Sequence, residues 1–174
     1  MRIFLETKRL LLKVTDPSDL QDWILLRQDP VVMKYIGTVK TKEEIENFFT
    51  DVAIPYHEKY GLGFCSVFEK ETGSFIGQAG LFHLGYDDTQ TDIEVAYRLL
   101  EKFWGKGYAT ELANVLVEWG FAHLPVQKLV GGAWADNAAS NQVLKKAGMH
   151  YTEKKMNDLN YEVLWYEIVR SDKF

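Results

Sequence analysis

The chain has 174 residues, a hydrophobic content of 47% and a formal net charge of −5. This length suits one domain with one substantial core, and the apolar content lies far from the disordered range. The negative charge argues against nucleic acid as a partner and favours a cationic partner such as an amine, although it also fits ordinary solubility.

Cysteine content and hydropathy bear on the compartment. The single cysteine, Cys65, cannot form an internal disulfide, which fits a reducing environment. The N-terminal stretch MRIFLETKRLLLKV interleaves apolar and charged residues and so lacks the apolar core of a signal peptide. No apolar run has the length that crosses a membrane. We therefore expect a cytoplasmic protein without a membrane partner.

The first part of the chain predicts a strand followed by two helices. We expect the strand over Arg9–Val14, after which Asp16 caps the first helix. Thr41 and Glu44 form a capping box at the start of the second helix. Pro55 should kink or end that second helix, because proline lacks the N–H that an inner helical turn uses.

The remainder alternates between strand and helix signals. Three strands are predicted in the middle, over Gly63–Glu69, Phe75–His83 and Asp92–Leu99. A helix then runs from Gly107 to about His123, followed by a strand (Lys128–Trp134), a helix capped by Asp136 or Asn137 and closed by Gly148, and a last strand (Tyr161–Val169). This order indicates an α/β domain with a mixed sheet.

The stretch KFWGKGYATE, Lys102–Glu111, places Gly105 and Gly107 directly before a helical run. A helix start presents unpaired N–H groups and the positive end of the helix dipole, so it suits an anion and above all a phosphate. Glycines let the main chain approach such a ligand closely. Alternatively, the two glycines only make a tight turn between strand and helix.

Two familiar phosphate-binding loops do not match this stretch. A P-loop requires Gly-Lys-Ser/Thr, whereas the chain has Gly107-Tyr108-Ala109. The dinucleotide fingerprint requires a third glycine at the position of Thr110.

The segment YRLLEKFWGKGYATE, Tyr97–Glu111, resembles the acyl-CoA-binding motif of the GNAT N-acetyltransferases, Gln/Arg-x-x-Gly-x-Gly/Ala. Gly107 and Ala109 match its second half, and Trp104 replaces Gln/Arg, as in the branch resembling ribosomal-protein N-terminal acetyltransferases. ETKRLLLKV and NAASNQVLKKAGM also resemble that branch. The resemblance implies a single N-acetyltransferase domain over residues 1–174, with a mixed, mostly antiparallel sheet whose two central parallel strands splay apart, flanked by helices.

The same resemblance implies acetyl-CoA or coenzyme A as cofactor. It assigns cofactor contacts to residues of the loop and its flanks: Tyr97, Leu99, Trp104, Gly105, Lys106, Gly107, Tyr108, Ala109 and Thr110. Asn137 and Ser140 resemble a second cofactor motif, in which the asparagine bonds the pantetheine and the serine approaches the thiol; alternatively, Asn137 or Asp136 is simply a helix cap. Gly131 and Gly132 mark a close approach of ligand, or else relieve crowding under Trp119 or Trp134.

Acetyl transfer requires an amine to attack the thioester carbonyl, a tetrahedral oxyanion to form and thiolate to depart. The protein must supply N–H donors for the oxyanion, a base for the ammonium proton and an acid or electrostatic aid for sulfur. By resemblance, the oxyanion donor is a main-chain N–H near Val95–Tyr97. Glu94 is the candidate base, unless it only pairs with Arg98 or a neighbouring strand.

The candidate acid follows from a departure from the family pattern. Many relatives carry a tyrosine seven residues after the asparagine that corresponds to Asn137, and they use it to protonate the thiolate. This chain has Leu144 at that position. Ser140 is therefore the remaining candidate acid.

Aromatic residues of the early helices and the far sheet edge are candidates for the acceptor pocket: Trp23, Tyr35, Phe48, Phe49, Tyr56, Phe82 and His83. Trp23, Phe48 and Phe49 also fit core-facing helical spacing. The four histidines show no metal-like spacing, so we expect no metal site. Cys65 is expected to be a small core residue.

These features together predict an N-acetyltransferase that transfers acetyl from acetyl-CoA to a primary amine, either a protein N-terminus or a small molecule. The alternative is a non-catalytic acyl-CoA-binding or sensing domain. Leu144, in place of the tyrosine acid, leaves this alternative open. A nucleotide-phosphate enzyme is disfavoured by the missing Lys-Ser/Thr. We expect no nucleic-acid partner, and either a monomer or a homodimer.

Overall fold

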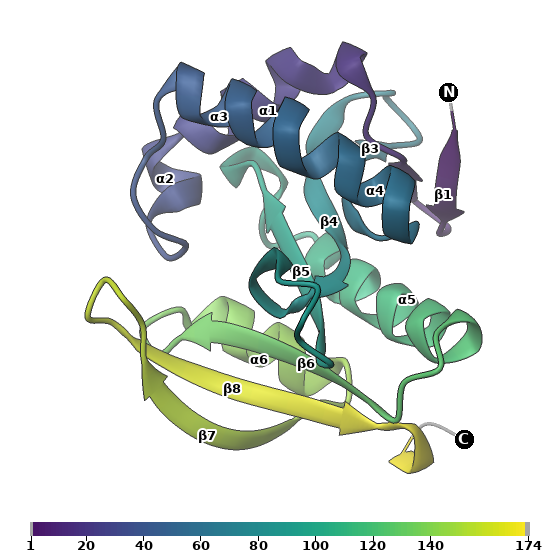
Figure 1. The fold of residues 1–174 in the computed structure, drawn as a ribbon, viewed down its shortest axis with the longest axis vertical. Coiled ribbons are helices and arrows are strands. Elements are labelled where there is room, and N and C mark those ends of the chain that lie inside the picture. Colours follow the sequence, from purple (N-terminus) through teal and green to yellow (C-terminus); the bar gives the residue numbers. More distant parts are fainter. Residues whose placement is uncertain (1, 173–174) are drawn as a thin grey trace. The chain divides into compact units, whose positions relative to one another are not determined.

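The computed structural model describes residues 2–172, and its elements follow one another in the order shown in Figure 1. The strands are β1 (Ile3–Glu6), β2 (Leu10–Lys13), β3 (Gly63–Glu69), β4 (Phe75–His83), β5 (Ile93–Leu99), β6 (Lys128–Trp134), β7 (His150–Met156) and β8 (Glu162–Val169). The α-helices are α1 (Leu20–Gln28), α2 (Pro30–Met33), α3 (Lys42–Phe48), α4 (Ile54–Tyr60), α5 (Tyr108–His123) and α6 (Ala138–Lys146).

Hydrogen bonds order the strands of residues 2–172 as β1-β2-β3-β4-β5-β6-β8-β7. The β1–β2, β2–β3, β6–β8 and β7–β8 pairs are antiparallel, and β5 and β6 are parallel. β5 and β6 are in register at Glu94 and Val130, whereas β6 pairs with β8 from Lys128 to Trp134. The predicted mixed, mostly antiparallel sheet with a parallel pair and flanking helices is confirmed.

The chain divides into two compact units. The first comprises Met1–Gly80 and Tyr97–Tyr108, and the second Leu81–Ala96 and Ala109–Phe174. The first unit buries apolar side chains of β2, α1, α3 and β3, including Leu10, Leu12, Trp23, Leu26, Ile45 and Val67. The second buries side chains of α5, β6, α6 and β8, including Leu112, Leu116, Phe121, Leu129, Leu144 and Ile168.

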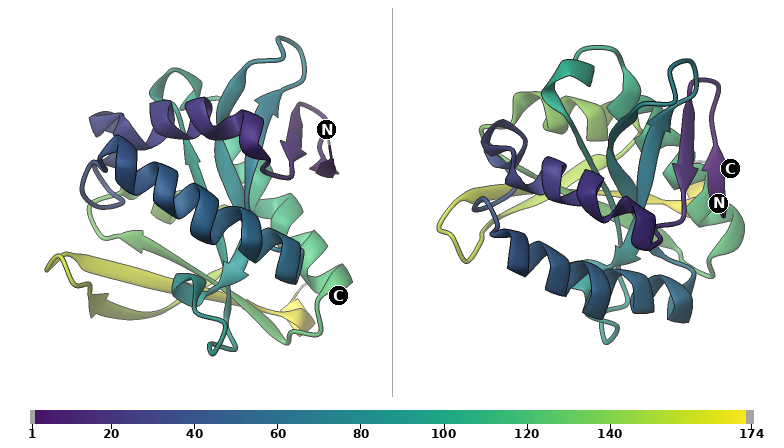
Figure 2. Two further views of the ribbon diagram at one scale, coloured as in Figure 1. Left: turned by 45° about the horizontal axis from the view of Figure 1, so that its top comes forward. Right: turned by 90° about the horizontal axis from the view of Figure 1, so that it is seen from above.

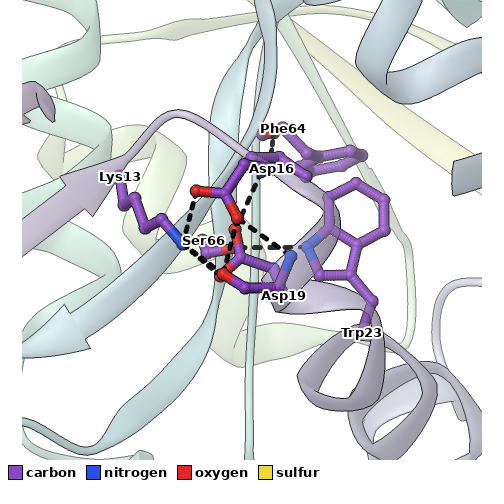
Figure 3. Close-up of polar contacts among 8 residues, drawn as sticks. Lys13, Asp16, Asp19, Trp23, Phe64 and Ser66 are labelled. Carbon is purple, nitrogen blue, oxygen red and sulfur yellow. Dashed lines mark hydrogen bonds and ion pairs between the residues drawn. The ribbon is translucent and has the colours of Figure 1, made fainter. Parts of the chain in front are cut away.

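A partly buried ion-pair cluster in the first unit fixes the start of α1 (Figure 3). Asp16 is the predicted cap, and a 3₁₀ turn over Pro17–Asp19 precedes the α-helix. Lys13 is only 7% exposed, and its ammonium nitrogen lies 2.8 Å from a carboxylate oxygen of Asp16 and 2.8 Å from one of Asp19. The hydrogen bond from Lys13 is the largest reason that the pKa of Asp16 falls to about 2.

The prediction that Pro55 kinks or ends the second helix is wrong, because the helical segment continues past Pro55 to Tyr60. Thr41 and Glu44 form the predicted capping box, and α3 then passes into a π-helical turn over Phe49–Ala53. Helix α4 follows directly, with Pro55 in its first turn, where a missing N–H is tolerated. The ribbon accordingly runs on without a sharp break (Figure 2).

Three elements were not predicted: β1, α2 and β7. All seven side chains of β7 are exposed, so neither face of this strand needs apolar residues. Its sequence, HYTEKKM, therefore lacks the alternation of apolar and polar residues that would have predicted a strand. Figure 1 shows β7 as the outer strand beside β8, where only one neighbour is needed.

Candidate functional site

The loop between β5 and α5 has the main-chain geometry that its glycines require. Gly105 and Gly107 have φ values of 71° and 79°, in the left-handed region that other residues avoid. A Cβ built on Gly105 would meet nothing within 4 Å, and one built on Gly107 would meet only Arg9 Nη2, at 3.5 Å. Among the described residues, no side chain therefore fills the space beside Gly105, and a side chain at Gly107 would point toward Arg9.

The N–H groups of the loop are available to an anion. Within residues 2–172, Gly105, Lys106 and Gly107 donate no main-chain hydrogen bond to a protein acceptor. They precede α5, a helix of 16 residues whose dipole places positive charge at this end. Lys102 precedes these residues and Lys106 lies between the two glycines, and each ammonium is 5.0 Å from the Phe103 ring centre. This combination of N–H groups, dipole and lysines suits a diphosphate.

Side chains at both ends hold the loop in the first unit. The Trp104 indole donates to the Leu99 carbonyl oxygen at 2.7 Å, although the side chain is 45% exposed. The Tyr108 hydroxyl, which is buried, donates to Glu69 Oε1. This hydrogen bond is the largest cause lowering the pKa of Glu69 and raising the pKa of Tyr108. Because its side chain is engaged inside the protein, Tyr108 has only its main chain to offer a ligand.

The other predicted contacts are accessible to different degrees. Leu99 is buried, Tyr97 is half-buried, and Lys106 is exposed. In the second unit, Ala109 and Thr110 are half-buried in the first turn of α5.

Glu94 lies in the second unit, half-buried, on β5, where it is paired with Val130 of the parallel strand β6. Along this stretch Ile93 and Val95 are buried, whereas Glu94 between them is half-buried. Glu94 therefore stands on a strand whose neighbouring side chains belong to the core of the second unit.

Asn137 caps α6, and its side chain accepts a hydrogen bond from the Ser140 main-chain N–H at 3.1 Å. The predicted cap is thus Asn137 and not Asp136. Both Asn137 and Ser140 are half-buried. The two residues of the second motif are therefore brought together at the start of one helix.

Asn141 and Tyr166 form a buried polar pair that sequence analysis missed. The Asn141 amide donates to the carbonyl oxygens of Trp134 at 2.9 Å and Asn137 at 2.8 Å. The Tyr166 hydroxyl donates to Asn141 Oδ1 at 2.9 Å. This pair fixes the end of β6 against the start of α6 and so positions Asn137 and Ser140. An asparagine inside an otherwise apolar helix face was the only available signal.

The interpretation of Gly131 and Gly132 as a close approach of ligand is not supported. A Cβ on Gly131 would lie 2.8 Å from Leu144 Cδ2, and one on Gly132 would lie 3.1 Å from the Trp165 ring. Packing inside the second unit therefore accounts for both glycines, with Leu144 and Trp165 as the nearest crowding side chains. Leu144 is 1% exposed, so an apolar core side chain stands where relatives carry tyrosine.

Several candidates for an acceptor pocket are core residues. Trp23 and Phe49 are at most 1% exposed, and the Trp23 indole donates to Ser66 Oγ at 3.1 Å (Figure 3). Tyr56 and Phe82 are also buried, which leaves Tyr35, Phe48 and His83 as the half-buried candidates. The Arg27 guanidinium lies 4.7 Å from the ring centres of both Trp23 and Phe48. The early helices thus carry a buried cation among aromatic rings.

Other kinds of site find little support. Cys65 is fully buried, as predicted, and burial raises the pKa of its thiol. In the described part of the chain, no three His, Cys, Asp or Glu side chains are grouped so that they could hold a metal ion. The helices of residues 2–172 are all too short or too polar to span a lipid bilayer.

Comparison with known proteins identifies the family. The model of the acetyltransferase (GNAT) domain matches residues 9–150. The uncharacterised protein YkkB of Bacillus subtilis is 31% identical over 147 residues, which cover 82% of this chain and 81% of that protein. The uncharacterised N-acetyltransferase YoaA of the same organism is 28% identical over 147 residues, covering 83% and 81%.

Solved structures share the fold. A GNAT-family acetyltransferase from Bacillus anthracis superposes with a TM-score of 0.80 at 23% identity, covering 98% of this chain and 99% of that one. RimL, a ribosomal L7/L12 α-N-protein acetyltransferase solved with coenzyme A, gives 0.79 at 16%, covering 97% and 98%. The spermidine N-acetyltransferase of Vibrio cholerae, solved with CoA and spermine, gives 0.78 at 17%, covering 95% and 98%. The chain belongs to the GNAT acetyltransferase family.

Proposed function

We propose that this chain transfers an acetyl group from acetyl-CoA to a primary amine, by direct attack of the amine. The observation that carries the proposal is the loop before α5. It has two glycines in the left-handed region and three main-chain N–H groups that donate to no protein acceptor, and it lies at the positive end of the α5 dipole. Family membership supports it, because RimL and the spermidine acetyltransferase are both solved with coenzyme A.

The residues present fit a CoA diphosphate at this loop. We assign the diphosphate to the N–H groups of Gly105–Gly107 and the first turn of α5, including Ala109 and Thr110. Lys106 supplies positive charge, and Trp104 ties the loop to Leu99 at the end of β5. Tyr97 and Leu99 on β5 and Asn137 on α6 are assigned to the pantetheine.

Acetyl-CoA supplies the thioester that the amine attacks. Glu94 takes a proton from the ammonium form of the acceptor, directly or through water, and so frees the neutral amine to attack; it is suited to this as a half-buried carboxylate in the central strand. A main-chain N–H near Val95–Tyr97 donates to the oxyanion. Ser140 is assigned as the donor of a proton to the departing thiolate, because the Leu144 side chain has no proton that it could donate.

The alternative, a domain that binds acyl-CoA without turnover, is favoured by one observation. Leu144 is an apolar core side chain at the position where many relatives carry the tyrosine acid. The loop would then be retained for binding alone, as in a sensor.

We also propose that residues 1–174 form a single N-acetyltransferase domain. Solved acetyltransferases that superpose along 98% of this chain support this proposal. The acceptor is a small amine or a protein N-terminus, and the chain acts as a monomer or homodimer without nucleic acid. A cytoplasmic location stays a prediction of the sequence.

One assay separates these functions: release of free thiol from acetyl-CoA across a panel of amines. The panel should contain a polyamine and a peptide with a free N-terminus, and ATP and NAD serve as binding controls. Thiol release that depends on the amine is expected. Binding of acetyl-CoA without release would identify a sensor, and preference for ATP would contradict both proposals.

A further inference from the structure

Arg9, at the start of β2, reaches a loop that lies 97 residues later in the chain. Its Nη1 donates a hydrogen bond to the main-chain carbonyl oxygen of Lys106 at 2.9 Å. Its guanidinium also lies over the Tyr108 ring, with Cζ 4.4 Å from the ring centre. The planar guanidinium can make both contacts at once, which a lysine ammonium cannot reproduce.

The hydrogen bond to Lys106 sets the direction of the next N–H. The Lys106 carbonyl and the Gly107 N–H belong to one peptide unit, which is planar and trans, so the two groups point in opposite directions. Because Arg9 holds the carbonyl, the Gly107 N–H points away from Arg9. The same main-chain nitrogen donates no hydrogen bond to another described residue.

A second contact keeps the Tyr108 ring in place beneath Arg9. The Tyr108 hydroxyl donates to Glu69 Oε1, and the Thr72 hydroxyl donates to Glu69 Oε2 at 2.7 Å. Glu69 is 9% exposed, so this anchor is largely shielded from water. Arg9 therefore packs against a ring that is already held in place. Its side chain loses little further conformational freedom when it holds the loop.

We propose that Arg9 is a positioning residue for CoA binding, which orients the Gly107 N–H toward the diphosphate by holding the Lys106 carbonyl. The proposal rests on the function proposed above. Arg9 acts through the loop, so its loss weakens recognition of the diphosphate and leaves the acetyl-transfer chemistry intact. Affinity for CoA and turnover at saturating acetyl-CoA should consequently separate.

The test compares Arg9→Met with Lys8→Met. Both changes remove one positive charge from adjacent positions, and Lys8 is exposed. Calorimetry should show about tenfold weaker CoA binding in Arg9→Met, as expected for the loss of one charge-assisted hydrogen bond, and unchanged binding in Lys8→Met. Turnover at saturating acetyl-CoA should be retained. Acetyl-pantetheine, which carries the same thioester without the diphosphate, should react equally with Arg9→Met and the wild type.

Salt separates orientation from simple attraction between charges. At about 1 M salt, where the Debye length is about 3 Å, the loss in Arg9→Met should persist. Its disappearance would overturn the proposal, as would equal CoA affinity in Arg9→Met and the wild type, or an equal loss with acetyl-pantetheine. If Arg9→Met is unfolded in a thermal melt, Arg9→Lys replaces it, and wild-type affinity in that variant overturns the proposal. Failure of the wild type to bind CoA would instead refute the proposed function.

Discussion

Leu144 Cδ2 fills the space beside Gly131, where a Cβ on the glycine would lie only 2.8 Å away. The contact joins α6 to β6 inside the second unit, and it explains both the glycine and the buried leucine. The position that supplies a proton in many relatives is thus part of the core in this chain.

This contact predicts an energetic coupling between the two residues. Gly131→Ala should destabilise the protein by about 1–3 kcal/mol through overpacking, and Leu144→Ala by about 2–5 kcal/mol through a cavity. The double variant should be less destabilised than the sum, because removing Cδ2 makes room for the new methyl group. Urea unfolding of all four proteins measures the coupling. Strict additivity would show that Leu144 does not crowd Gly131.

Glu94→Gln should reduce turnover by about 100-fold and leave CoA affinity unchanged, because the amide cannot accept the ammonium proton. The pH–rate profiles of the two proteins should therefore differ, because the variant without the base depends on amine that is already deprotonated in solution. Asp92→Asn is the matched control, since Asp92 precedes Glu94 by two residues and lies 3.4 Å from Lys128. An unaltered pH–rate profile in Glu94→Gln would remove Glu94 as the base.

The ion-pair cluster before α1 predicts how stability depends on pH. The pKa of Asp16 is about 2 in the folded protein, against 3.8 for an ordinary aspartate, so its carboxylate stabilises the fold above pH 3.8. This contribution is lost as the pH falls through about 2. Asp16→Asn should therefore cost about 1 kcal/mol at neutral pH, a value reduced by solvent screening because the side chain is 41% exposed.

Chemical denaturation of Asp16→Asn and the wild type across the acid range measures this dependence. The difference in free energy of unfolding should shrink as the pH approaches 2. Asp22→Asn is a control of opposite sign, because burial raises the pKa of Asp22 and the loss of its charge favours folding at neutral pH. A cost for Asp16→Asn that is independent of pH would contradict the assignment.

Local signals predicted much of the fold. The capping box of Thr41 and Glu44, the Asn137 cap and the closing Gly148 were found because each depends on residues within one or two helical turns. The strands β3, β4 and β6 have the predicted bounds. By contrast, β7 is exposed on both faces, and Pro55 is accommodated by a π-helical turn that leaves no composition signal.

The candidate site was predictable only where it is local. Gly105 and Gly107 were found from their spacing before a helix, and their left-handed φ values agree. Arg9, Glu69 and Tyr166 act on residues 25 to 97 positions away in the chain. A single sequence carries no sign of such pairs, because each forms only when the fold brings a strand together with a distant loop or helix.

The central claim is that main-chain N–H groups before α5 bind a diphosphate, and calorimetry of CoA binding to Gly107→Ala tests it most directly. Alanine is strained at the Gly107 φ of 79°, so the loop is expected to relax into another conformation, although the added methyl group would only touch Arg9 Nη2, at 3.5 Å. Gly61→Ala, at a φ of 65° with open space around it, introduces the same kind of strain at the end of α4. We expect at least about tenfold weaker CoA binding for Gly107→Ala and unchanged binding for Gly61→Ala. Equal affinity in all three proteins would contradict the account.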